Sequence, residues 1–389
     1  MSIFDRNSET MPRATLEQLQ LERLQALLAR LKRNVRRYRE RIADLRLESL
    51  ADLAKFPFTT PEDVADSFPY GLFSFPLREI IRLHSIMGPK GSTLVVGHTR
   101  NDLVHWGRLA ARQFAASGMT PNDVVQVALS GGLYRGALGY ALGAEQIEAS
   151  VIEEEPHCIE AQLNLLENYR PTVLVTTPTN ALALMNAMAH HRKDPQSFHL
   201  RTVFLSRPVA GELWNEIRAG LQVNVSCNFG IDEILDPGFS VQCEAGRFHV
   251  NEDQFLVEVE DGELIVTTLA REAMPLLRYR TRLACETPRE KCSCGRTGTV
   301  IMPKGRLDNR FRVGETPLYE EQIAQVLRSH LKEEHPYNHT VAGDKLVVSI
   351  QMTPAIFSDM IWQLEDFRRR MVTDFLDRLG VVAEVRFVY

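Results

Sequence analysis

Several features are scarce in this chain of 389 residues, and each absence removes a class of protein. Six cysteines are too few for a disulfide scaffold of this length. No apolar run approaches the roughly 18 residues that a membrane span needs, and the start does not resemble a signal peptide. Repeats and low-complexity segments are also missing. These absences predict a cytoplasmic protein that binds no membrane.

A strong net charge is missing too. The formal net charge of -5 argues against a general nucleic-acid or membrane-surface binder. Arginine is nevertheless dense between Arg30 and Arg41. On an amphipathic helix these cations form either a solvated face or a docking surface for an acidic partner.

The apolar residues make up 44% of the chain, enough to bury a large core and to predict one large and one small domain. Residues 1–14 have the composition of a loose leader. Thr15 then begins a predicted helix, with Gln18 as its capping-box partner. The apolar positions from Leu16 to Tyr38 recur at helical spacing, so one face of this helix is predicted to be buried.

Further along, the pattern alternates. A strand, a glycine loop and a second strand are predicted over 79–99, and short β-rich runs alternate with helices over 123–219. This alternation is typical of βαβ units and predicts an α/β fold with a large layered domain. Residues 307–389 have the pattern of a small α+β lid. The expected domains are therefore 1–305 and 306–389, with a zinc-binding segment at 243–294.

Short motifs succeed one another along most of the chain: Phe56–Thr60, Phe68–Leu72, Thr177–Thr179, Asp236–Phe239, Ala273–Thr281 and Cys294–Thr297. In this order they resemble the phenylacetate–CoA ligase group of the adenylate-forming superfamily. In working members, ATP and a carboxylic acid form an acyl-adenylate, which CoA captures as a thioester. The resemblance implies a mobile C-terminal domain with a hinge just after Gly305, at which Arg306 and Asp308 match the family pattern.

The nucleotide-binding positions depart from that pattern. The phosphate loop aligns with Ile86–Leu94, where the glycines remain but hydroxyls are lost and Pro89 removes an N–H group. This segment is either a weakened anion site or an ordinary glycine turn. The ribose-binding acid falls at Leu283, next to Arg282 in place of glycine, and a leucine accepts no hydrogen bond. The segment aligned with adenine binding, 206–209, lacks the acid that the family has there. The lysine that the family's lid carries near its C-terminus has no counterpart in this sequence. We therefore expect that ATP is no longer the substrate.

One nucleotide element is largely retained. The segment Phe229-Gly230-Ile-Asp-Glu233 matches the family's Tyr-Gly-x-Ser/Thr-Glu element. By this resemblance Glu233 could hold Mg²⁺, and Phe229 could stack on a base. Asp232, however, places a carboxylate where it would repel phosphate. Binding of ATP and Mg²⁺ therefore remains doubtful.

Four residues have the composition of a structural zinc site: Cys243, His249, Cys292 and Cys294. Three thiolates and an imidazole can close a tetrahedron around Zn²⁺. The Cys-x-Cys pair is tighter than the commoner Cys-x2-Cys and the two halves lie far apart in sequence, so spacing alone is moderate evidence. The resemblance adds to it, because relatives in the ligase group carry a similar cluster. The alternative is buried free thiols and a surface histidine.

Cys227 precedes Phe229 by two residues and is a candidate nucleophile, because a thiolate there could accept an acyl group from a thioester. Core packing is the alternative for Cys227, and the default for Cys158 and Cys285. The segment 130–145 resembles the family's acyl pocket, which makes Tyr134 and Gly136 candidate substrate-binding residues. Thr177 and Gly230 are further candidates. Helix packing is the alternative interpretation of that segment.

These residues leave three functions open. The first is a divergent member that moves an aryl or acyl group between CoA and an acyl-carrier-protein thiol, or primes such a carrier, without ATP. The second is an active AMP-forming aryl-CoA ligase whose nucleotide site uses substitute residues. The third is a non-catalytic binding or scaffold protein. A homodimer is left open, as are the acyl group and the acceptor.

Overall fold

The computed structural model describes residues 3–129, 137–152, 158–209, 211–288, 290–331, 336–351 and 364–388. The chain divides into two compact units. The first comprises Met1–Ile86 and Leu94–Leu307, and the second comprises Met87–Thr93 and Asp308–Tyr389. The mixed helices and strands confirm the predicted α/β fold class. Among the described residues, no helix is both long enough and apolar enough to cross a membrane.

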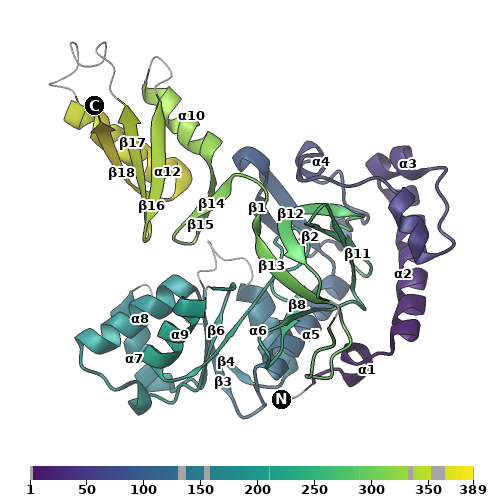
Figure 1. Cartoon of the computed structure of the whole chain (residues 1–389), viewed down its shortest axis with the longest axis horizontal. Helices are drawn as coiled ribbons and strands as arrows, with labels where there is room; N and C mark the ends of the chain where they lie inside the picture. Colours follow the sequence, from purple (N-terminus) through teal and green to yellow (C-terminus); the bar gives the residue numbers. More distant parts are fainter. Residues whose placement is uncertain are drawn as a thin grey trace. The chain divides into compact units, whose positions relative to one another are not determined.

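The first unit contains a five-stranded parallel sheet of order β4-β3-β5-β6-β7 (Figure 1). Its strands are β3 (Val124–Ala128), β4 (Ser150–Ile152), β5 (Val173–Thr176), β6 (Thr202–Leu205) and β7 (Asn224–Cys227). Five helices accompany it: α5 (Arg100–Ala116), α6 (Ala137–Gln146), α7 (Ile159–Tyr169), α8 (Pro178–His190) and α9 (Gly211–Leu221). The strands alternate with helices, as the βαβ pattern predicts.

Alternation of side chains along these strands explains the two layers of helices. Val173 and Val175 pack in a cluster with residues of α5 and α6. Leu174, Val203 and Leu205 pack in another cluster with residues of α7, α8 and α9. Successive strand residues point to opposite faces, so helices cover both faces of the sheet.

A second sheet in this unit has six strands in the order β10-β11-β12-β13-β9-β8. The strands are β8 (Ser240–Gln242), β9 (Phe248–Val250), β10 (Phe255–Glu260), β11 (Glu263–Thr268), β12 (Tyr279–Glu286) and β13 (Val300–Arg306). Every residue of β11 is buried, as expected for an interior strand. A separate hairpin of β1 (Arg82–Met87) and β2 (Thr93–His98) contains the short helix η3 (Pro89–Gly91) at its turn.

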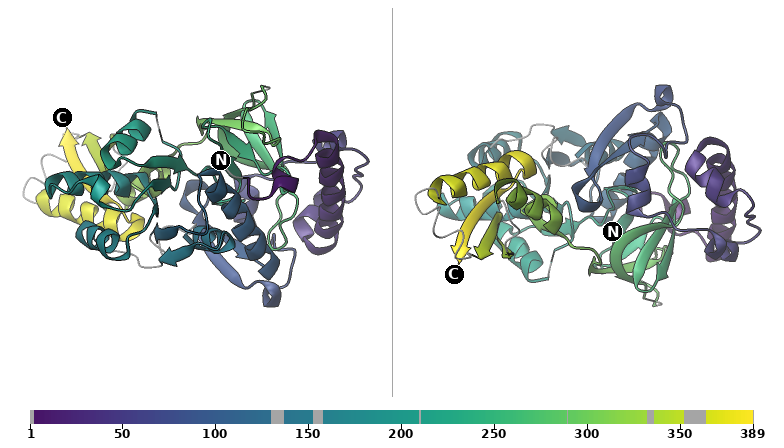
Figure 2. Two further views of the ribbon diagram at one scale, coloured as in Figure 1. Left: turned by 90° about the horizontal axis from the view of Figure 1, so that it is seen from below. Right: turned by 90° about the horizontal axis from the view of Figure 1, so that it is seen from above.

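The N-terminal region consists of α1 (Arg6–Glu9), α2 (Arg13–Asn34), α3 (Arg36–Ile42), η1 (Leu50–Lys55), α4 (Pro61–Asp66) and η2 (Leu77–Glu79). Figure 2 shows α2 and α3 packed side by side. The expected loose leader is wrong, because Glu9 is buried and bonded to Arg296 over 2.8 Å. The capping box at Thr15 is wrong as well, since α2 begins at Arg13.

The second unit has its own apolar cluster. Its elements are β14 (Arg310–Val313), β15 (Thr316–Tyr319), α10 (Glu320–His330), β16 (Tyr337–Ala342), β17 (Lys345–Gln351), α12 (Leu364–Leu379) and β18 (Val382–Val388). β16 pairs antiparallel with β17, which pairs parallel with β18. Phe375 and Met371 of α12 are fully buried and belong to the cluster. The C-terminal residues thus form a small α+β body.

Candidate functional site

The carboxyl ends of β5, β6 and β7 meet at one edge of the parallel sheet. The register pairs Thr176 with Leu205 and Leu205 with Cys227, so the segments that succeed these strands begin side by side. Ligands of open α/β sheets bind at this edge. Thr177, the Ser206–Val209 segment and the Phe229–Glu233 segment all begin there. The structure thus brings together three segments that the sequence singled out separately.

A buried hydrogen-bond network ties this edge together through Asn228. Gln113 donates to Asn228 Oδ1 over 2.6 Å, and Asn228 Nδ2 donates to the carbonyl of Ser206 over 3.3 Å and to Asp236. Asn228 and Gln113 are almost fully buried. Sequence reasoning missed this network, although the polar residue directly after a buried strand was a usable signal. These bonds join α5 to the segments that follow β6 and β7, although the buried Gln113 Oε1 has no partner among the described residues.

The side chain of Thr177 has a structural role at this edge. It accepts a hydrogen bond from the Asn180 N–H over 3.1 Å and so caps α8. Asn180 in turn donates to the hydroxyl of Thr176 over 2.7 Å. Capping accounts for a threonine followed by proline at this position. Its contact with a substrate stays a prediction.

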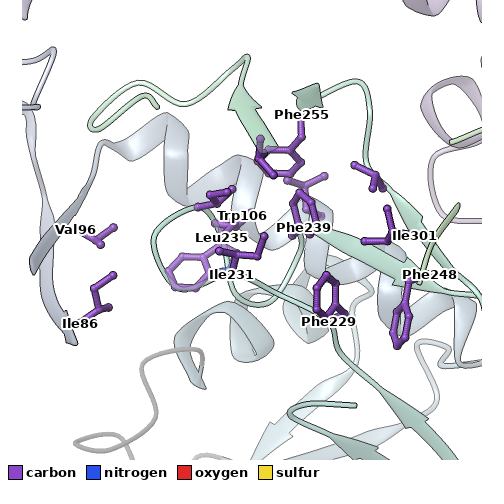
Figure 3. Close-up of a cluster of buried hydrophobic side chains, with 14 of the residues drawn as sticks. Ile86, Val96, Trp106, Phe229, Ile231, Leu235, Phe239, Phe248, Phe255 and Ile301 are labelled. Atoms are coloured by element: carbon purple, nitrogen blue, oxygen red, sulfur yellow. The ribbon is translucent and has the colours of Figure 1, made fainter. Parts of the chain in front are cut away.

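Phe229 lies in the core. It is 7% exposed, and its ring packs 6.1 Å from that of Phe239 and 5.7 Å from that of Phe248 (Figure 3). A ring with neighbours of this kind presents no open face to a nucleotide base. The burial therefore corrects the expectation that Phe229 stacks on a base.

Gly230 is required by close packing. A Cβ atom at this position would lie 2.2 Å from Asp236 Oδ1 and 2.8 Å from Asp236 Cα. Because backbone cannot move aside as a flexible side chain can, only glycine fits here. Glu233 lies further along the same loop and is mostly buried. Its role as a magnesium ligand, and the contact of Gly230 with substrate, stay predictions.

Cys227 is a poor nucleophile. The side chain is 3% exposed, and burial raises the pKa of its thiol to about 12. At neutral pH it is therefore a neutral thiol, whereas catalysis needs the thiolate. Its backbone N–H donates to Gln242 Oε1 over 2.8 Å. The structure corrects the nucleophile hypothesis in favour of core packing.

The glycine turn at Gly88–Ser92 bonds to itself. The N–H groups of Gly88, Gly91 and Ser92 donate to the carbonyls of Ser92, Gly88 and Pro89, over 2.7, 3.2 and 3.0 Å. Pro89 has no N–H. An anion cradle needs N–H groups that converge on the ligand, and these three point into the turn instead. Lys90 adopts a positive φ of 53°, a backbone conformation that glycine adopts more readily.

In the region aligned with ribose binding, a residue other than glycine again has a positive φ. Arg282 has a φ of 57°, which favours glycine, and its N–H donates to Glu263 over 2.8 Å. Leu283 is the next residue and pairs with Arg306 across β12 and β13. A leucine side chain offers no acceptor to a sugar hydroxyl. Arg282 thus has a glycine-like backbone next to a residue that is not an acid.

The two hinge candidates lie on either side of the division between the units. Arg306 ends β13 in the first unit, and Asp308 begins the second unit. Within the second unit, the Tyr319 hydroxyl donates to Asp308 Oδ2 over 3.4 Å. A hinge function for these residues stays a prediction. Tyr134 and Gly136, the candidates for the acyl pocket, lie outside the described residues.

Cys243, His249, Cys292 and Cys294 come together in the first unit, with their ligand atoms within 4.8 Å of one another. The Sγ atoms of Cys243 and Cys292 are 3.6 Å apart, and Cys294 Sγ lies 3.3 Å from His249 Nε2. Sulfurs bound tetrahedrally at about 2.3 Å from Zn²⁺ lie roughly 3.8 Å apart. His249 Nδ1 lies 3.0 Å from the carbonyl of Gly298, which fixes the ring with Nε2 toward the sulfurs. These four residues fit a structural zinc ion.

The cations of the N-terminal helices mostly serve the fold. Arg30 donates to the carbonyl of Arg271, and Lys32 donates to the carbonyls of Ala43 and Leu45. Arg37 and Arg41 both pair with Asp63, and Arg39 donates to the carbonyls of Lys32 and Arg33. Arg33 and Arg36 are nevertheless exposed, and a docking surface for an acidic partner stays a prediction.

His98 was not singled out from the sequence. It ends β2 and is 1% exposed, and neither ring nitrogen has a hydrogen-bond partner among the described residues. Its ring stacks 4.8 Å from Trp106 and 5.2 Å from His84. Burial first, and then the charge of Arg271, holds its pKa well below the usual range. His98 is therefore a neutral imidazole at neutral pH.

Comparisons with known proteins bear on the fold and on the relatives of the chain. No protein-family model matches the chain. It is 32% identical to a phenylacetate–coenzyme A ligase of Thermus thermophilus, over 97% of this chain and 93% of that protein. It is 34% identical to one of Pseudomonas putida, over 85% of this chain and 81% of that protein. A solved 2-hydroxyisobutyryl-CoA ligase, in complex with 2-HIB-AMP and CoA in its thioesterification state, superposes with a TM-score of 0.88. That structure, at 24% identity over 98% of this chain and 88% of its own, shows a shared fold.

The buried, neutral His98 predicts a loss of stability in acid. A pKa lowered by folding means that the unfolded chain binds the proton more readily, so stability falls as pH drops below about 6.5, by up to about 1.4 kcal/mol per pH unit. The variant His98→Phe should lose less stability between about pH 7.5 and pH 5.5 than the unmodified protein. Melting temperatures at both pH values measure this difference. The exposed-site variant His190→Phe should behave like the unmodified protein, and equal acid loss in His98→Phe would contradict the assignment.

Proposed function

Because the chain belongs to the phenylacetate–coenzyme A ligase family of adenylate-forming enzymes, we propose that it handles thioesters between CoA and a small aryl or acyl group without using ATP. The names of the relatives support CoA and a small acyl group as ligands. The loss of ATP chemistry is our own inference. It rests above all on the glycine turn at Gly88–Ser92.

The turn supports this proposal because the N–H groups of Gly88, Gly91 and Ser92 are already engaged. They donate to carbonyls of the turn itself, over 2.7 to 3.2 Å. A phosphate would have to break these bonds before it could be bound. Leu283 offers no acceptor for the ribose, and the Ser206–Val209 segment carries no acid for the adenine. The weakened contacts would concern the phosphate, the sugar and the base of one nucleotide.

The reaction that fits is direct exchange between thiols. The thiol of an acyl carrier protein loses its proton, and its sulfur attacks the thioester carbonyl to form a tetrahedral intermediate. The bond between the carbonyl carbon and the CoA sulfur then breaks, and the CoA thiolate takes up a proton. One thioester replaces another, so positioning of the reactants is enough and no ATP is needed. No enzyme thiol takes part, in keeping with the buried, neutral Cys227.

An active AMP-forming ligase is the second candidate. It is favoured by the retention of Glu233 and by the established names of the relatives. In such an enzyme Glu233 would hold Mg²⁺ beside the phosphates. The third candidate, a non-catalytic scaffold, would bind the acyl-CoA and do nothing further.

Two assays separate the three candidates. We expect acyl transfer from a panel of aryl- and acyl-CoA thioesters to pantetheine or a carrier thiol without ATP, and no ATP-dependent exchange of pyrophosphate with any acid. Replacement of the carboxylate in Glu233→Gln should leave transfer within about twofold, because no magnesium–nucleotide complex is involved. Circular dichroism of the variant checks its fold.

Pyrophosphate exchange that disappears in Glu233→Gln would instead establish the ligase. Binding of acyl-CoA with neither acyl transfer nor pyrophosphate exchange would leave the non-catalytic scaffold as the remaining candidate. Either result contradicts the proposed transfer.

We also propose that Cys243, His249, Cys292 and Cys294 hold one structural Zn²⁺. Four protein ligands close the tetrahedron, so such an ion stabilises the fold and activates no water. Two of the ligands flank the β8–β9 turn and two lie between β12 and β13, so the ion would join parts of one sheet. The carbonyl of Gly298 would keep His249 in the ligating orientation.

Atomic emission should find about one zinc per chain. Chelation under mild denaturant should lower the melting temperature and make the thiols of Cys243, Cys292 and Cys294 reactive, whereas only the exposed Cys158 should react in the native protein. The variant Cys292→Ser should lose zinc, while Cys158→Ser should keep it. A fully folded protein that contains no zinc and shows these three thiols reactive would refute the site.

A further inference from the structure

We propose that occupancy of the zinc site controls the docking of the N-terminal segment, residues 3–12, which we call the N-terminal strap. The strap contains α1 and lies in the first unit, as do the four candidate zinc ligands. It contacts residues 290–299, the zinc loop, which lies between β12 and β13 and carries Cys292 and Cys294. The inference rests on the proposed zinc site and goes beyond it, because a structural ion need not govern another segment.

The zinc loop is bonded to the strap directly after its cysteines. Arg296, two residues beyond Cys294, donates from Nε to Glu9 Oε2 over 2.8 Å. Thr297 donates from its backbone N–H to the carbonyl of Glu9 over 3.0 Å. The hydroxyl of Thr297 donates to the carbonyl of Met11 over 2.8 Å. Two consecutive residues of the zinc loop therefore hold the strap.

The ion pair between Glu9 and Arg296 is buried, with 2% and 4% of the two side chains exposed. Breaking such a pair inside the protein is costly, because each partner keeps its charge without a counterion. The other oxygen of the Glu9 carboxylate accepts from the N–H of Asp5 over 2.9 Å, so the same carboxylate fixes the start of the strap. If the loop moves Arg296 away, Glu9 is more stable in water than in its buried position, and the strap leaves with it.

The strap and the zinc loop both depend on contacts outside themselves. α1 is a single turn of four residues, far shorter than a helix that is stable by itself. Asp5 is a second anchor and accepts from Arg112 over 3.1 Å, but Arg112 is already paired with both carboxylate oxygens of Asp253. The zinc loop contains no helix or strand. Metal bound through Cys292 and Cys294 therefore gives this loop the fixed position that docking requires.

Hydrogen exchange followed by mass spectrometry tests the coupling. The N–H groups of Ser8, Glu9 and Thr10 are hydrogen-bonded within the docked strap and should be protected in the zinc-loaded protein. Chelation of the metal, or the variant Cys292→Ser, should raise their exchange rates by at least about tenfold. The amides of α8 should exchange as before, which shows that the rest of the unit stays folded.

The variant Glu9→Gln tests the coupling from the other side. It should release the strap even with zinc bound, because the buried guanidinium of Arg296 loses its counterion. Coupling between two sites is reciprocal, so competition with a chromophoric chelator should show about tenfold weaker zinc binding in this variant. Glu40→Gln, which removes the exposed partner of Arg36 on α3, is the matched control and should bind zinc like the unmodified protein.

The possible failures can be told apart. If zinc is present but the strap amides exchange equally before and after chelation, this inference is overturned and the zinc site stands. The inference also fails if Glu9→Gln binds zinc as tightly as the unmodified protein, or if α8 loses protection together with the strap. Folded protein that neither contains nor takes up zinc would overturn both proposals.

Discussion

The buried side-chain amide of Asn228 holds the edge of the parallel sheet on which the rest of the site depends. It accepts from Gln113 of α5 and donates to Ser206 after β6 and to Asp236. Gln113 also donates to the carbonyl of Ser240 at the start of β8. Helix, parallel sheet and antiparallel sheet are thereby joined by two side chains. Gln113 Oε1 is the one buried acceptor of these two side chains that has no partner among the described residues.

This network fixes the segment that leaves the end of β7. Once Asn228 is held, Phe229 enters the aromatic cluster with Phe239 and Phe248, and Gly230 packs against Asp236. The ring of Phe229 is thereby buried among other rings, whereas a contact of Gly230 with substrate stays a prediction. Lys90 of the glycine turn and Arg282 both have left-handed backbone conformations. The chain has the fold of its relatives, and the loss of its nucleotide contacts is a proposal that rests on these sequence positions.

Local patterns were sufficient for much of the fold. Alternation of strands and helices gave the parallel sheet, because burial on both faces produces short apolar strands between amphipathic helices. The Cys/His set was also found, since few other residues can serve as zinc ligands. By contrast, Glu9 and Arg296 are 287 positions apart, and Arg30 meets a carbonyl 241 positions away. No local pattern reports such partners, which is why the N-terminal segment was mistaken for a loose leader. For the same reason, the sequence did not predict the burial of Cys227 or that the ring nitrogens of His98 have no hydrogen-bond partner among the described residues.

The central claim is that the nucleotide site has been lost while the family fold is kept. Calorimetric titration of ATP with Mg²⁺ into folded, zinc-assayed protein tests it most directly. The account predicts no measurable heat of binding at ATP concentrations up to about 1 mM, which corresponds to a binding free energy weaker than about -4 kcal/mol. Saturable binding at micromolar ATP would contradict it. In that case the turn at Gly88–Ser92 must open to receive phosphate, and the chain would be an active ligase.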